Sequence, residues 1–343
     1  MGTMAEGVRQ AVEVCLKVRA GEKAVIITDE RTRQIGEAFK TAIEAIGGGG
    51  GDAGVARTVV YFIMEDFGAR PIDYPPAIEA ALLAADVSIY AAQGTKGELQ
   101  SFRRPMIETV EANPKLRHAH MIAITPEIMC DGMCSDYVEV QRVSRLVHDR
   151  VKDARAIRVQ TEKGCDFTAQ FSPALKWIIS DGNVRPDEWQ NLPDGEVCTA
   201  PATVNGRAVF DGCLGEFFME RHSSLAETPV TVEIRDGRAV RETLTCENTE
   251  LRDELATYIF EMDENSDRVG EFAIGTNTGL TKLIGNLLQD EKFPGVHIAF
   301  GSPYPSRTGA DWDSIAHLDI SVVAPTITVD GETLMEKGQF CFE

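Results

Sequence analysis

The sequence predicts an α/β protein of two domains. Residues 1–155 are expected to form a doubly wound, Rossmann-like domain around a parallel sheet, and residues 156–343 an α+β metal-site domain rich in antiparallel strands. A chain of 343 residues is long enough for two domains of common size. In its first half, β-branched apolar runs alternate with helical segments. In its second half, short alternating segments end at turn signals.

The first half has the rhythm of βαβ units. The segments between its apolar runs carry apolar residues three and four positions apart, so each can lay one apolar stripe on a sheet. Strand, helix and strand in alternation favour a parallel sheet. The predicted strands are residues 24–28, 58–62, 87–90 and 121–124, and the predicted helices are residues 31–46, 76–85 and 102–111.

The turn after the first predicted strand does not suit a dinucleotide. No G-x-G-x-x-G pattern follows the strand, and Asp29 and Glu30 stand there instead. Two carboxylates would repel a pyrophosphate at the helix N-terminus that follows. The sequence therefore disfavours a nicotinamide cofactor.

The predicted domain boundary follows a long amphipathic segment, residues 136–154, which leads to a strand at residues 156–160. Beyond it, residues 230–234 alternate in polarity and are followed by Asp236 and Gly237, a turn signal typical of antiparallel hairpins.

Charge and composition exclude several classes of partner. The chain has 34 Lys and Arg against 54 Asp and Glu, a net charge of −20, and no basic cluster that would neutralise phosphates, so no nucleic-acid partner is expected. No stretch approaches the about 18 apolar residues of a membrane span. The first residues lack a secretory signal, so we expect a cytoplasmic protein whose eight cysteines are reduced thiols.

The strand-like residues 315–323 carry the first candidate metal ligands. Period-two alternation places His317 and Asp319 on one face and Leu318 and Ile320 on the other. An imidazole and a carboxylate on one strand face can bind a single ion. A simple His–Asp hydrogen bond at a sheet rim is the alternative interpretation.

Three further side chains stand in apolar surroundings. His297 lies in a glycine-bounded apolar strand at residues 295–301 and needs a polar partner there, and a strand pair with residues 315–323 would supply one. Glu271 lies inside the apolar residues 269–277, and Glu196 follows a turn at the start of a short strand. Each alone has a structural explanation, but hard oxygen donors with imidazoles together suit a catalytic Zn, Co, Mn or Fe ion.

The segments that hold these residues, 191–201, 270–277, 297–301 and 317–319, resemble in content and order the thermophilic metallo-aminopeptidase family of the aminopeptidase T and S type. The resemblance implies a divalent metal, Zn or Co, as one or two ions, a small peptide as substrate and a homodimer. It implies Glu196, Glu271, His297, His317 and Asp319 as metal ligands. The catalytic residues expected are Glu196, as the carboxylate beside the activated water, and Tyr304, as a hydrogen-bond donor to the developing oxyanion.

One departure from the family pattern leaves the number of ions open. The family places a ligand glutamate five residues before the first histidine of the pair, and Lys292 stands there in this chain, beside Asp290 and Glu291.

Two other functions are kept as alternatives. A sister branch of that family resembles 2,5-dihydroxypyridine dioxygenase, in which two histidines and an aspartate hold one ferrous ion. His317 and Asp319 match two of these iron ligands. Glu271 stands at the position of the other histidine. A non-catalytic metal-binding relative is the third possibility. The remaining histidines, His118, His120, His148 and His222, are interpreted as structural or solvated.

Overall fold

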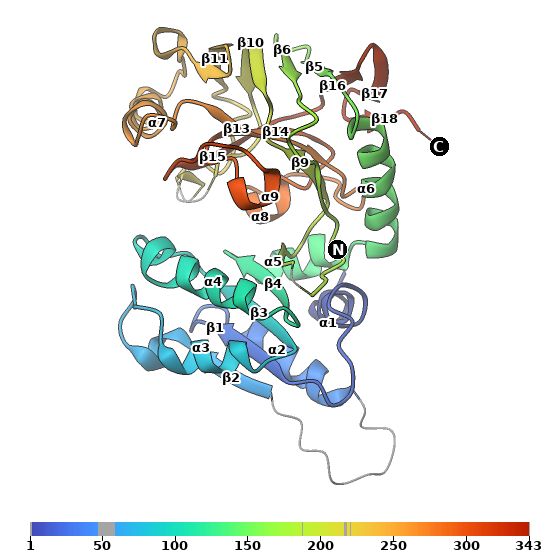
Figure 1. Ribbon diagram of the computed structural model, residues 1–343, viewed down its shortest axis with the longest axis vertical. Coiled ribbons are helices and arrows are strands. Elements are labelled where there is room, and N and C mark those ends of the chain that lie inside the picture. Colours follow the sequence, from blue (N-terminus) through green and yellow to red (C-terminus); the bar gives the residue numbers. More distant parts are fainter. Residues whose placement is uncertain (1, 47–58, 187, 216–217, 220, 343) are drawn as a thin grey trace. The chain divides into compact units, whose positions relative to one another are not determined.

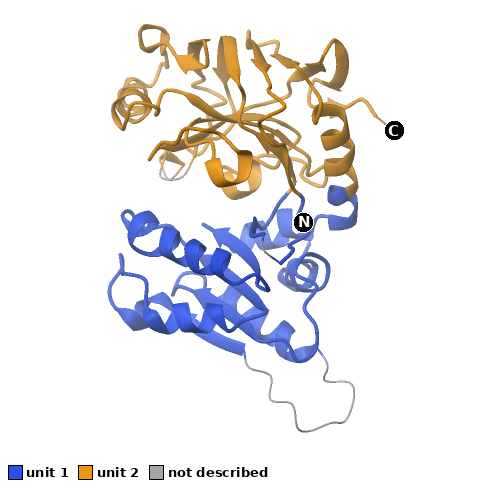
Figure 2. Cartoon of the chain, viewed as in Figure 1, with its two compact units in different colours: residues 1–141, 181–194 blue, residues 142–180, 195–343 orange. Residues whose placement is uncertain are grey.

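The computed structural model describes residues 2–46, 59–186, 188–215, 218–219 and 221–342 (Figure 1). Its contacts define two compact units, residues 1–141 with 181–194, and residues 142–180 with 195–343 (Figure 2). These units differ from the 1–155 and 156–343 domains at two places: residues 142–155 belong to the second unit, and residues 181–194 return to the first. The division into domains of residues 1–155 and 156–343 remains a prediction.

The first unit is built on a parallel sheet of strand order β2-β1-β3-β4-β8. Because crossovers between parallel strands are right-handed and the order reverses between β1 and β3, its connecting helices fall on both faces. This is the doubly wound class that the sequence predicts. The strands are β1 (Ala24–Thr28), β2 (Val59–Ile63), β3 (Val87–Ala92), β4 (Arg117–Ile122) and β8 (Gln190–Asn191), and the helices are α1 (Met4–Arg9), α2 (Arg33–Ala45), α3 (Pro76–Leu83), α4 (Arg104–Ala112) and α5 (Pro126–Cys130).

Strand β1 has the predicted bounds, and β2 ends one residue later than predicted; Thr58, the first residue of the predicted second strand, lies outside the described residues. Strand β4 begins at Arg117, four residues before the predicted start. His118 and His120 therefore lie inside β4, and both are buried. His118 Nδ1 is 2.7 Å from the hydroxyl oxygen of Ser88, and the His120 ring stacks on Tyr90. Burial lowers the pKa of His118 to about 3 and the pKa of His120 well below its ordinary value, so both imidazoles are neutral core groups.

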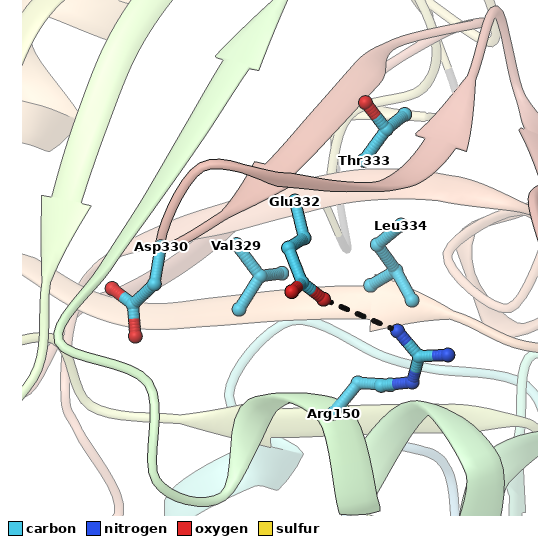
Figure 3. Close-up of a pocket in the computed structure, with 6 residues that line it drawn as sticks. All are labelled: Arg150, Val329, Asp330, Glu332, Thr333 and Leu334. Carbon is cyan, nitrogen blue, oxygen red and sulfur yellow. Dashed lines mark ion pairs between the residues drawn. The ribbon is translucent and has the colours of Figure 1, made fainter.

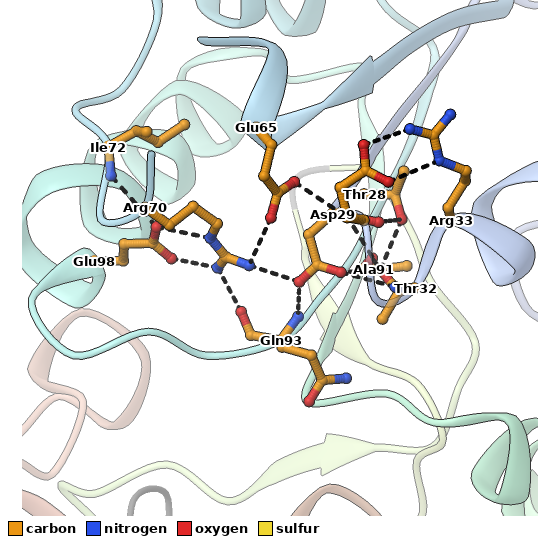
Figure 4. Close-up of polar contacts among 11 residues, drawn as sticks. Thr28, Asp29, Thr32, Arg33, Glu65, Arg70, Ile72, Ala91, Gln93 and Glu98 are labelled. Carbon is orange, nitrogen blue, oxygen red and sulfur yellow. Dashed lines mark hydrogen bonds and ion pairs between the residues drawn. The ribbon is translucent and has the colours of Figure 1, made fainter. Parts of the chain in front are cut away.

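A guanidinium lies at the carboxyl ends of β1 and β3, where doubly wound sheets usually bind ligands (Figure 4). Arg70 donates hydrogen bonds to Asp29 Oδ2 at 2.6 Å, to the carbonyl oxygen of Gln93 at 2.6 Å and to Glu98 Oε1 at 2.9 Å. The carboxylates of Asp29 and Glu98 are buried, and this one guanidinium is an ion-pair partner of both.

The second unit contains two antiparallel sheets. The larger has the order β12-β11-β10-β6-β5-β16-β17-β18, and the smaller, here called the site sheet, has the order β15-β14-β13-β9-β7. The strands are β5 (Ala156–Gln160), β6 (Asp166–Gln170), β7 (Ile178–Ser180), β9 (Glu196–Thr199), β10 (Thr203–Phe210), β11 (Val230–Arg235), β12 (Arg238–Ala239), β13 (Val269–Gly275), β14 (Gly295–Gly301), β15 (His317–Val322), β16 (Thr326–Val329), β17 (Glu332–Glu336) and β18 (Gln339–Phe340).

One hydrophobic core joins the two sheets of this unit. Phe210 of β10 and Phe300 of β14 meet edge to face in it, with ring centroids 6.4 Å apart. Helices α6 (Tyr137–Val151) and α7 (Thr249–Glu261) add buried residues to the same core. Two short helices, α8 (Leu287–Asp290) and α9 (Pro305–Thr308), precede and follow strand β14 in the sequence. The core takes one face of the site sheet and leaves the other for polar side chains.

All eight cysteines are free thiols. Among the described residues, no helix combines the length and apolar character that crossing a bilayer requires.

Candidate metal centre

Four adjacent strands of the site sheet carry the predicted ligands on a single face. The intervening residues, among them Phe272, Ile298 and Leu318, belong to the hydrophobic core on the opposite face. The predicted pairing of the His297 strand with the His317 strand is confirmed, since β14 and β15 are antiparallel neighbours. Strands β9, β13, β14 and β15 lie side by side in Figure 1.

Strand register brings the ligands level with one another. Glu271, Ala299 and Asp319 form one row across β13, β14 and β15. The next row contains Ala273 and His297. Since alanine carries only a methyl group, the two alanines leave space between the longer carboxylate and imidazole side chains.

Glu271, His317 and Asp319 form the first group of side chains that could hold an ion, which we call group A. His317 Nε2 lies 3.4 Å from Glu271 Oε2 and 3.4 Å from Asp319 Oδ2. His317 Nδ1 is 3.0 Å from the carbonyl oxygen of Ser302, so it donates there and turns Nε2 toward the carboxylates. A backbone carbonyl commonly orients a metal-binding imidazole in this way.

Glu291, His297 and Asp319 form a second group, which we call group B. One ligand atom from each residue lies within 4.8 Å of the others. Asp319 belongs to both groups, so its two oxygens face two neighbouring positions for a cation. His297 Nε2 is 4.0 Å from Asp319 Oδ1 and 3.9 Å from Glu271 Oε1, which links the groups.

Glu196 lies at the edge of this cluster. Its Oε2 is 3.5 Å from His297 Nε2, while its Oε1 is 2.7 Å from Lys292 Nζ. Glu196 also falls into a third group with Glu271 and Cys198. Burial raises the pKa of the Cys198 thiol well above its ordinary value, and the nearby carboxylates add to this effect, so the sulfur is a protonated thiol.

Burial and mutual repulsion shape the charges of group A. Burial and the nearby Asp319 raise the pKa of Glu271. Burial would lower the pKa of His317, but Asp319 and Glu271 outweigh it and raise the value to about 10. Burial opposes ionisation of Asp319, yet His317 holds its pKa at about 2. The imidazole of His317 therefore retains a proton at neutral pH. Its positive charge stabilises the two nearby carboxylates, a role that a bound cation could also fill.

Tyr304 lies beside the cluster at the start of α9. Its ring centroid is 4.6 Å from that of His317, and 40% of the residue is exposed. Its backbone is left-handed, with φ of 50°, which places the side chain at the bend between β14 and α9.

All five predicted ligands thus gather on one sheet face, and the residue that the sequence analysis does not select is Glu291. Asp290, its neighbour, accepts hydrogen bonds from the backbone N–H groups of Ile284 and Gly285 and holds that loop. Glu291 instead joins His297 and Asp319. The sequence did offer a hint of this: Glu291 directly precedes Lys292, and Lys292 stands at the position where the family pattern has a ligand glutamate.

A surface pocket elsewhere in the second unit contains none of these residues (Figure 3). Its walls come from Arg150 and residues 329–330 and 332–334, and an ion pair of 3.7 Å joins Arg150 to Glu332 across it. Both partners of this pair are exposed, so the pocket offers no buried polar group like those of the ligand cluster.

A sheet face that gathers buried carboxylates and imidazoles around shared positions for a cation is typical of a metalloenzyme. The chain belongs to the thermophilic metalloprotease family (M29), whose sequence pattern matches residues 139–343. Two solved structures share its fold. The 2,5-dihydroxypyridine dioxygenase from Pseudomonas putida KT2440 has a TM-score of 0.71 and 15% identity, covering 99% of this chain and 97% of its own. Wild-type AmpT from Thermus thermophilus has a TM-score of 0.67 and 16% identity, covering 99% of each chain. No curated protein matches the chain in sequence.

Proposed function

We propose that this chain is a metal-dependent aminopeptidase that removes N-terminal residues from short peptides. The observation that carries the proposal is group A in a member of a metalloprotease family. Its donors are two carboxylates and an imidazole whose second nitrogen is held by a backbone carbonyl. These residues fit a catalytic divalent ion better than a structural one, since structural zinc is usually held by thiolates.

A bound divalent ion supplies an acidified water and a Lewis acid for the scissile carbonyl. Glu271, His317 and Asp319 would hold it. Glu196 is proposed as the carboxylate that accepts the proton of the attacking water. Tyr304 is proposed to donate a hydrogen bond from its phenolic hydroxyl to the developing oxyanion. The negative charge around them favours a substrate that presents a free α-ammonium.

The metal is proposed to be zinc or cobalt, and the assembly a homodimer, both from the family resemblance. Elemental analysis of the purified protein identifies the metal, and light scattering measures the assembly.

A panel of aminoacyl chromogenic substrates tests the function. We expect turnover of aminoacyl p-nitroanilides and none of their N-acetylated forms, because acetylation removes the α-ammonium. Glu271→Ala and His317→Ala should each abolish turnover and metal content while the circular dichroism spectrum is retained. Glu250→Ala and His148→Ala, outside the cluster, are the matched controls. Turnover retained in either cluster variant would contradict the proposal.

A ring-cleaving dioxygenase with one ferrous ion is the second candidate. His297 and His317 both lie within 4.0 Å of Asp319, and two histidines with one carboxylate are the donor set of non-haem iron oxygenases. We place the dioxygenase second because its iron site needs two histidines and one carboxylate. Each three-residue group with a histidine among the described residues has one histidine and two carboxylates. Oxygen uptake with 2,5-dihydroxypyridine and ferrous ion would reverse the order. Bound metal with no turnover of either substrate class would indicate the third possibility, a non-catalytic metal-binding protein.

A further inference from the structure

We propose that the ammonium group of Lys292 takes the second of the two cation positions in this centre, so that the chain binds one divalent ion in group A rather than two. The inference deepens the proposed function and rests on the metal centre described for it. It follows from the position of the lysine, from the charge of the cluster and from the packing that holds the lysine in place.

The position of Lys292 is between two carboxylates of the cluster. Its side chain is 0% exposed, and Nζ lies 2.7 Å from Glu196 Oε1 and 2.7 Å from Glu291 Oε1. Glu291 is a member of group B, and the other oxygen of Glu196 faces His297 of that group. The ammonium therefore already binds the carboxylate that a cation in group B would need.

The charge of the cluster points to the same conclusion. In the metal-bound state, where the histidines are neutral, the four ionised carboxylates of Glu196, Glu271, Glu291 and Asp319 and the ammonium of Lys292 together carry three negative charges. One divalent ion leaves a single negative charge, whereas two would leave a buried net positive charge. Because a buried charge without a partner is strongly disfavoured, the lysine makes a second divalent ion unfavourable.

The backbone around Lys292 gives the ammonium little freedom to leave. The Lys292 N–H donates to the carbonyl oxygen of Gln289, and the Lys292 carbonyl accepts from the N–H of Asn277, each at 3.0 Å. The segment also runs against β13, where a Cβ on Gly275 would lie 2.0 Å from the carbonyl oxygen of Phe293. Strand β13, which carries Glu271, and the lysine are thus packed as one unit.

The division of the cluster follows from these contacts. Glu271, His317 and Asp319 are the donors of the single ion, while Glu196 and Glu291 are held by Lys292. Glu196 is then not a metal ligand: Lys292 binds its Oε1, and its Oε2, on the side of His297, is left for the proposed proton transfer.

The test counts metal ions without any substrate. The metal-free protein is dialysed against zinc ions, and separately against cobalt ions, and bound metal is measured by mass spectrometry. We expect one ion per chain for the wild type and for Lys337→Gln, an exposed lysine that serves as the matched control. Lys292→Gln and Lys292→Met remove the ammonium at similar side-chain length and should bind close to two ions.

The wild type decides the matter even where the Lys292 variants fail to fold, as judged by circular dichroism. Zero ions or two ions bound to the wild type would overturn the inference, and so would one ion bound to a folded Lys292 variant. Glu291→Gln is a second test. We expect this variant to bind one ion with a Kd within threefold of the wild-type value. A loss of affinity of more than tenfold would show that Glu291 is a metal ligand and would overturn the assignment. The wild type with one ion but no peptidase activity would refute the proposed function and leave this inference standing.

Discussion

The proton on His317 leads to a quantitative prediction about metal binding. In the metal-free protein Asp319 and Glu271 raise the pKa of His317 to about 10, so its imidazole is fully protonated at pH 7. A metal binds the neutral imidazole, and an ion that uses His317 must displace this proton. The perturbation is therefore the addition of zinc ions to metal-free protein at controlled pH.

The magnitude follows from the distance between pH and pKa. Three pH units separate pH 7 from a pKa of about 10, so the proton weakens apparent metal affinity at pH 7 by roughly 1,000-fold, about 4 kcal/mol. We expect the affinity to rise about tenfold per pH unit from pH 7 to 9 and to level off near pH 10. Asp319, with its pKa lowered to about 2, is already ionised and releases nothing in this range.

Calorimetry in buffers of different ionisation enthalpy measures the released protons. About one proton per bound ion is expected at pH 8 for the wild type and for His148→Gln, a histidine outside the cluster. An unperturbed histidine, with a pKa near 6.5, would release almost none at that pH. Release close to zero, together with an affinity that is flat between pH 7 and 9, would refute the reasoning that the carboxylates of group A retain a proton on His317.

Three further perturbations follow from the structure. Tyr304→Phe should lower kcat about 100-fold with unchanged metal content, because removal of one oxyanion donor has an effect of this size; steady-state kinetics and elemental analysis measure the two quantities. Ala299→Leu should reduce bound metal below one tenth of the wild-type amount, because a leucine would fill the space between Glu271 and Asp319; metal analysis after dialysis measures it. Arg70→Met should lower the free energy of unfolding by about 3–5 kcal/mol in urea titrations, because it removes the cation that pairs with the buried carboxylate of Asp29.

Each has a control that separates it from general damage. An unchanged kcat in Tyr304→Phe would remove the tyrosine from the proposed chemistry. Ala256→Leu, on helix α7, tests whether added volume alone causes metal loss. Arg33→Met removes a guanidinium that pairs on the surface with Glu30 and should leave the urea midpoint unchanged. Equal stability of Arg70→Met and the wild type would mean that the buried network of the first unit contributes nothing.

Much of the fold was predictable because it depends on local periodicity. The βαβ rhythm of the first half needed only the alternation of apolar strands with amphipathic helices, and β1 and β5 occur at the predicted residues. The alternation of His317, Leu318 and Asp319 also predicted which side chains share a face, since a strand has a period of two whatever its neighbours are.

Other features depend on contacts between distant segments. Residues 181–194 supply strand β8 to the parallel sheet of the first unit, although the chain has already entered the second unit. His118 and His120 are polar residues, so the sequence pattern did not indicate a buried strand there. In the structure their rings contact Ser88 and Tyr90 of the neighbouring β3. No local pattern contains that information.

The candidate site divides in the same way. Residue type and alternation alone determined that carboxylates and imidazoles would stand on one face of apolar strands, where water cannot stabilise them and a cation can. Which of them meet was decided by the tertiary structure: strand register sets Glu271 level with Asp319 across Ala299, and the end of helix α8 brings Glu291 to His297. The tertiary structure also decided the role of Lys292, because only the packing of its loop against β13 places a buried ammonium between Glu196 and Glu291.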